Sequence, residues 1–150
     1  MKGLSIVACI AMLAVPGMAS AQAGHGCDAI NIGPQVLAAF PRAKEACQGV
    51  LTKGDQPFMK LTGEVQSANS ETVTVNFLDR NQKPLSQVVF AVNNPDARIS
   101  VSGTQTRVSR LQRGTTVSFY IQHNRWGLFA DPDSAPLTIL SRTDLGAATN

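Results

Sequence analysis

The sequence predicts a mainly β domain, a small five- or six-stranded barrel preceded by one short α-helical segment. Two observations predict this fold class. From residue 57 onward apolar and polar residues alternate with a period of two, which is typical of strands with one buried face. Groups of Asn, Asp, Gly and Pro separate these stretches, as turns between short strands would require. Only the segment from Pro34 to Cys47 has the three- and four-residue apolar spacing of a helix.

Residues 1–23 predict a cleavable export signal. Lys2 provides the positive start, an apolar run follows from Leu4 to Val15, and cleavage is expected after Ala21 or Ala23, each the end of an A-x-A site. The apolar run of about 12 residues is too short to span the ~30 Å hydrocarbon core of a membrane. We therefore expect a periplasmic or secreted protein without a transmembrane segment.

The charge of the mature chain is close to balanced. Loss of Lys2 lowers the Lys and Arg count from 13 to 12 against 10 Asp and Glu, a net charge of +2. A mild excess of this kind is not the basic footprint of a nucleic-acid-binding protein, so no nucleic-acid partner is expected.

The two cysteines that follow the signal predict a disulfide. Cys27 and Cys47 form an even pair in an oxidising compartment, and only one intramolecular pairing is possible. Closing a loop of about 20 residues would stabilise the fold by roughly 3 kcal/mol. The alternative is a reactive or metal-binding pair, against which the spacing argues because it is not C-x-x-C.

Residues 24–56 are expected to form a helical leader tied by this disulfide. Pro34 suits the first position of a helix, and Pro41 predicts either a kink or two short helices. Gly49 is the expected end of the helical stretch.

Residues 57–141 are expected to form the barrel, with residues 142–150 as a tail. The expected strands are 59–66, 72–77, 88–92, 97–101 and 117–122, with a sixth strand or an edge pairing at Leu137 and Ile139. Between the last two of these five, residues 103–105 predict a turn, and residues 108–114 predict one helical turn that ends at Gly114 and places Leu111 in the open end of the barrel. Arg107, Arg110 and Arg113 then lie three apart, either as an anion-binding patch or, more commonly, as a solvated charged face.

The spacing of several motifs is familiar. Gly63-x-Val65, Thr72-Val73-x-Val75, Phe90-x-Val92 and Leu111-x-x-Gly114-x-x-Val117 resemble exported proteobacterial OB-like small-barrel domains of unknown function, over residues 58–122. The segments 40–44 and 125–127 resemble uncharacterised proteobacterial periplasmic proteins. The resemblance implies a fold and a compartment, and it implies no catalytic residue.

No motif for metal binding or catalysis stands out, so no cofactor and no metal are expected. His25 and His123 are the only histidines, and a single Met59 remains after the signal, too few for a copper cluster. His123 with Asp131 or Asp133 can be drawn as a base and its orienting group. That pairing supports the alternative function, a periplasmic hydrolase or metal-handling protein.

The preferred hypothesis is an exported non-catalytic domain that binds an envelope protein, a glycan or a small ligand. Tyr120, His123, Arg125 and Trp126 are the candidate contact residues, joined by the row Arg107, Arg110 and Arg113. Tyr, Trp and Arg are enriched where interfaces carry their binding energy. Trp126 can equally be a core residue that covers the mouth of the barrel.

Overall fold

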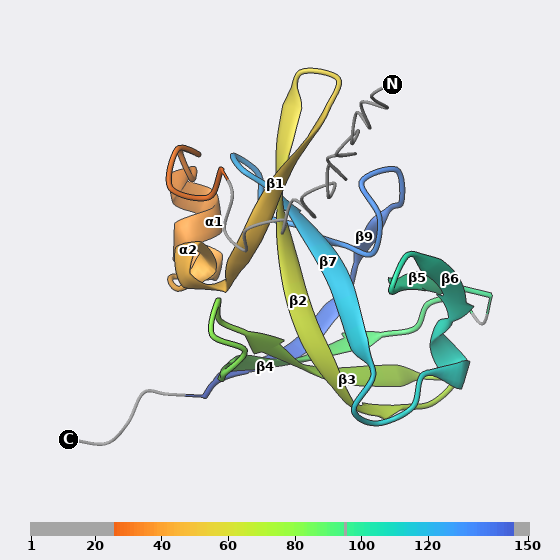
Figure 1. Ribbon diagram of the computed structural model, residues 1–150. Coiled ribbons are helices and arrows are strands. Elements are labelled where there is room, and N and C mark those ends of the chain that lie inside the picture. The colour runs from red at the N-terminus through yellow and green to blue at the C-terminus, as the bar shows by residue number, and fades with distance from the viewer. Residues whose placement is uncertain (1–25, 95, 146–150) are drawn as a thin grey trace, which may run out of the picture.

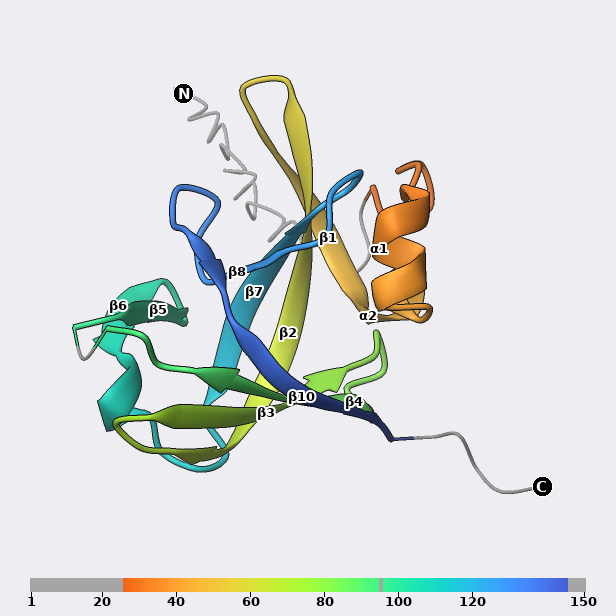
Figure 2. The ribbon, with the colours of Figure 1, turned by 180° about the vertical axis from the view of Figure 1, so that it is seen from behind.

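The computed structural model describes residues 26–94 and 96–145. The predicted export signal and its cleavage sites lie outside these residues. The described chain is mainly β, as predicted, and contains strands β1 to β10, two short α-helices and one 3₁₀ turn. Eight strands form one sheet that curls on itself, and two form a separate pair (Figures 1 and 2). The curled sheet thus has more strands than the five or six predicted for the barrel.

The leader contains two short helices, α1 (Pro34–Ala39) and α2 (Ala43–Ala46). The chain breaks between them at Phe40 and Pro41, which confirms the second of the two outcomes predicted for Pro41. Helix α1 ends with a hydrogen bond of 2.7 Å from the amide of Phe40 to the carbonyl oxygen of Val36. Val36, Phe40 and Ala43 are buried, so the helices pack an apolar face onto the sheet.

The leader then continues as a strand rather than as an extended helical segment. β1 (Cys47–Lys53) pairs antiparallel with β2 (Gln56–Ala68), with a turn at Gly54, which has a positive φ of 56°. Gly49 therefore lies inside a strand and does not end a helix, contrary to the sequence-based expectation. In Figure 1 this β1–β2 hairpin projects beyond the rest of the sheet.

The central strands follow the predicted alternation. β2, β3 (Thr72–Leu78), β4 (Pro84–Ala91) and β7 (Thr116–Gln122) each bury every second side chain over most of their length. Asn69 closes the β2–β3 turn, because its side-chain oxygen accepts bonds of 2.8 Å from the amides of Glu71 and Thr72. Asp79 closes the β3–β4 turn in the same manner.

Residues 98–110 form a small unit at one side of the sheet. β5 (Arg98–Val101) pairs with β6 (Thr104–Arg107), and η1 (Val108–Arg110) is a single 3₁₀ turn. Residues 104 and 105, expected in a turn, belong instead to β6, and the turn lies at Ser102 and Gly103, which both have positive φ. The helical turn expected over 108–114 is shorter than predicted. Leu111 is buried, as expected, with 7% of its surface exposed.

The last strands join the two ends of the sheet. Its order is β10-β4-β3-β2-β7-β8-β9, and β1 pairs with β2 beside this path. β8 is Leu128–Phe129, β9 is Pro136–Leu137 and β10 is Ile139–Asp144, which continues past residue 141, the predicted end of the barrel. β9 and β10 stand at opposite ends of this order, yet only Thr138 separates them in the chain. The sheet therefore curls around a common core.

Aromatic rings fill the centre of the curled sheet. The Phe119 ring meets those of Phe77 and Phe90 edge-on, with centroids 5.4 and 5.5 Å apart. The Arg142 guanidinium lies 5.5 Å from the centroid of the Phe40 ring, which links β10 to the leader. None of the helices in the described ranges is long and apolar enough to cross a membrane.

Candidate functional site

Tyr120 lies on the outward face of β7, as its alternation with buried Phe119 and Ile121 predicted. It stands opposite Lys60 on β2 and Phe129 on β8. With Lys60 and three residues of β1 it lines a shallow hollow of about 280 Å³. Partial burial, and secondarily the charge of Asp131, raises the pKa of Tyr120 above its ordinary value.

His123 follows the end of β7 and faces a different hollow. Its Nδ1 atom lies 3.3 Å from the carbonyl oxygen of Pro57, and its backbone carbonyl accepts a 2.7 Å bond from the amide of Gly33. A Cβ atom on Gly33 would lie 2.9 Å from the Cα of Asn124, so the leader can approach this turn closely only with glycine there. His123 therefore helps to seat the leader on the β7–β8 turn.

The two aspartates considered as partners of His123 have other contacts. Asp131 accepts a 2.9 Å bond from the amide of Asp133 within the β8–β9 turn. Asp133 forms an ion pair with Lys53 on the β1–β2 hairpin. Within residues 26–94 and 96–145, no three His, Cys, Asp or Glu side chains gather as a metal-binding group.

Arg125 and Trp126 lie in the β7–β8 turn. Arg125 is exposed, whereas Trp126 is half-buried and packs against the edge of the core. Trp126 thus has one part of its surface against the core and another part open to solvent. Tyr120 and His123 line two different hollows and do not converge on one cavity.

The predicted arginine row is only partly assembled. Arg107 and Arg110 line a shallow depression of about 410 Å³ together with Arg98, Gln105 and Thr106, whereas Arg113 is not among its lining residues. This depression belongs to β5, β6 and η1. Figures 1 and 2 both show that unit on the opposite side of the molecule from the β7–β8 turn. The row therefore lies apart from the β7–β8 turn, which carries Arg125 and Trp126.

An apolar hollow of about 280 Å³, which no sequence pattern predicted, lies between three segments. It lies between the end of β4, the start of β5 with η1, and the β8–β9 loop. Its apolar lining includes Phe90, Val108 and Ala130, all buried. Asn93, Asn94, Arg98 and Ser134 supply the polar groups of its lining, described here as its rim. The side-chain nitrogen of Asn93 donates a 3.0 Å bond to the hydroxyl of Thr138, which fixes one side of that rim.

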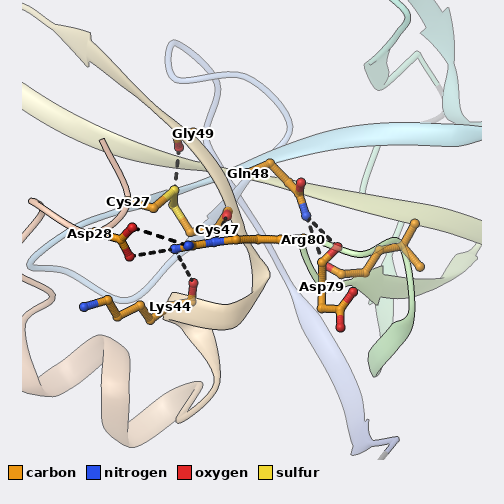
Figure 3. The surroundings of a disulfide bond; sticks show 9 residues. Cys27, Asp28, Lys44, Cys47, Gln48, Gly49, Asp79 and Arg80 are labelled. Carbon is orange, nitrogen blue, oxygen red and sulfur yellow. Dashed lines mark hydrogen bonds and ion pairs between the residues drawn. A yellow bond between two sulfur atoms is a disulfide. The ribbon is translucent and has the colours of Figure 1, made fainter. Parts of the chain in front are cut away.

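The predicted disulfide between Cys27 and Cys47 is present, with Cα atoms 6.0 Å apart (Figure 3). Arg80, from the β3–β4 turn, reaches across to this bridge. Its guanidinium lies 3.1 Å from a carboxylate oxygen of Asp28 and donates bonds of 3.3 and 3.4 Å to the carbonyl oxygens of Cys47 and Lys44. The hydrogen bond and charge of Arg80 lower the pKa of Asp28. These contacts tie the leader to the sheet.

Comparisons with protein-family models, with curated proteins and with solved structures found no significant match. The function is therefore inferred from the residues of this chain.

Proposed function

We propose that this chain is an exported, non-catalytic domain with an OB-like barrel, and that it binds a small ligand in the hollow between β4, β5 and the β8–β9 loop, here called the apolar hollow. The apolar hollow itself is the observation that carries the proposal, because a concave apolar site with a few polar groups is the common form of a small-ligand site.

The order of the strands supports the OB-like class. The long strand β2 pairs with β3 on one side and with β7 on the other, and β3, β4 and β10 follow one another. Such an order would suit a five-stranded Greek-key barrel with β1, β8 and β9 as additions. Export is supported by the predicted signal and by the Cys27–Cys47 bridge, since disulfides persist in oxidising compartments. An intact-mass measurement of the exported protein should give a mature chain that begins at Gln22 or Gly24.

The size and lining of the apolar hollow favour a small ligand over a glycan. Its volume of about 280 Å³ lies just below the range for sites of drug-sized ligands, roughly 300–1,000 Å³, which leaves room only for a small molecule. Phe90, Val108 and Ala130 offer an apolar surface that sugar hydroxyls would not satisfy.

A second candidate is a partner-protein contact around Tyr120, favoured by the apolar side chains on the same side of the sheet. Leu51, beside Tyr120, is 45% exposed, and the rings of Phe58 and Phe129 pack edge-to-face on the same side of the sheet, with centroids 5.9 Å apart. Trp126 and Arg125 would extend this contact from the β7–β8 turn.

The test of the small-ligand proposal is calorimetric titration of the mature protein with a neutral apolar compound, n-octanol. Ala135 lines the apolar hollow and is exposed, so Ala135→Phe should fill the site without disturbing the core. Ala38→Phe, at an exposed position on α1, is the matched control. We expect octanol to bind to the wild-type and control proteins and at least about 10-fold more weakly to Ala135→Phe, as the loss of apolar contact area implies. Equal binding to all three proteins, or no binding to any, would contradict the proposal.

A further inference from the structure

We infer that the ligand is amphipathic: its apolar part lies in the apolar hollow, and its anionic head group binds to the arginines of the neighbouring depression. This inference rests on the proposed function and adds the chemical class of the ligand. The head group is a carboxylate or a phosphate, the two anions that a guanidinium can hold with paired hydrogen bonds.

Arg98 joins the two sites. It lies at the start of β5 and lines both the apolar hollow and the depression that contains Arg107 and Arg110. A single ligand can therefore cross from one to the other at this residue. Gln105 and Thr106 also line the depression and add polar groups beside the arginines.

The β-sheet register places two of these arginines in direct opposition. Arg98 on β5 pairs across from Arg107 on β6. Like charges that stand directly opposite on neighbouring strands destabilise the pair. A bound anion between the two guanidinium groups would remove this repulsion, so the arrangement favours the occupied site.

The carboxylates around the depression do not neutralise all of its positive charge. Asp96 pairs with Arg107 at 3.1 Å and offsets one positive charge. In the part of the chain that the structure describes, Arg98 and Arg110 have no carboxylate within 4.0 Å. Asp133, on the β8–β9 loop near the hollow, is offset by Lys53. The depression thus keeps a net positive charge.

The experiment compares ligands that share a tail and differ in the head. The mature protein is titrated at pH 7 with n-octanol, octanoate and octyl phosphate, and with acetate and inorganic phosphate as heads without the tail. We expect octanoate or octyl phosphate to bind about 10-fold more tightly than octanol at low salt, as two exposed ion pairs would provide. In 1 M NaCl this advantage should fall toward none, because the Debye length is then about 3 Å.

Two variants test whether the arginines of the depression cause the tighter binding of the anionic compounds. Arg107→Gln/Arg110→Gln should abolish the advantage of the anionic compounds, because it leaves only Arg98 beside the unpaired carboxylate of Asp96. It should leave octanol binding unchanged, because neither residue lines the apolar hollow. Arg113→Gln is the matched control, since Arg113 is an exposed arginine that does not line the depression. It should keep the full advantage.

The inference is overturned if octanoate and octyl phosphate bind no more tightly than octanol, or if the double variant keeps their advantage. It is also overturned if inorganic phosphate binds as tightly as octyl phosphate, because the tail would then contribute nothing. Each of these results leaves octanol binding, and hence the proposed function, intact. Failure of octanol to bind would instead contradict the proposed function itself.

Discussion

Replacing Gly63 by alanine should destabilise the fold strongly and in a way that one second change repairs. Gly63 lies on β2, opposite Phe77 on the neighbouring antiparallel strand β3. A Cβ atom there would lie 2.3 Å from the Cγ1 atom of Val75 and 3.2 Å from Cδ1 of Phe77, both buried side chains. Val75 cannot easily turn away, because a β-branched side chain has few allowed rotamers. We expect Gly63→Ala to cost about 3 kcal/mol of unfolding free energy, the upper part of the range for overpacked cores.

Val75→Ala removes the atom that the new methyl group would meet. Alone it should cost about 2 kcal/mol, from two lost methyl groups and the space they leave. In the double variant the methyl group introduced at position 63 occupies part of that space. The double variant should therefore lose only about 2 kcal/mol rather than the additive 5 kcal/mol, a coupling of about 3 kcal/mol.

Urea unfolding, followed by the fluorescence of the single Trp126 with the disulfide intact, measures these free energies. Val73→Ala is the matched control. It is another buried valine on β3, but it is not among the nearest atoms to Gly63, so its effect should add to that of Gly63→Ala. Additive free energies for Gly63→Ala and Val75→Ala, or a Gly63→Ala protein as stable as wild type, would refute the steric reasoning.

Three further changes test other parts of the fold. Cys27→Ser with Cys47→Ser should cost about 3 kcal/mol in urea unfolding, from the loop of 20 residues that the bridge closes, and a loss under about 1 kcal/mol would contradict this. Ser86→Ala should leave stability unchanged or raise it by about 1 kcal/mol, because the buried Ser86 hydroxyl has no hydrogen-bond partner among the described residues; a clear loss of stability would reveal one. Trp126→Ala should lower the stability by about 1–3 kcal/mol, less than the roughly 3–5 kcal/mol of a fully buried tryptophan, since Trp126 is only half-buried; a loss of 4 kcal/mol or more, on the order expected for complete burial, would contradict this placement.

The sequence predicted the central strands because their burial alternates. β3 and β7 bury every second residue over most of their length, which produces the period-two pattern directly. β1 was missed because its later residues are all exposed, so that no alternation marks it. β6 was missed for the same reason, since Thr104 to Arg107 are polar and pair only with β5.

The candidate site was predicted only in its local features. The alternation of apolar and polar residues in β7 correctly predicted that Tyr120 lies on the outward face. The apolar hollow is built from residues near 90–98, 108 and 130–137, which the curling of the sheet brings together. In the sequence, Phe90 and Val108 look like ordinary core residues. Arg98 was missed because spacing along the chain groups Arg107 with Arg110 and Arg113, whereas strand pairing places Arg98 opposite Arg107.

Amide chemical shifts of the ¹⁵N-labelled mature protein, recorded during titration with octanoate, test the central claim most directly, because they locate the ligand. We expect shifts that saturate and that cluster at Ala91, Ala97, Arg98 and Ala135, around the apolar hollow and the start of β5. Shifts that cluster instead around Tyr120, or that never saturate, would contradict it.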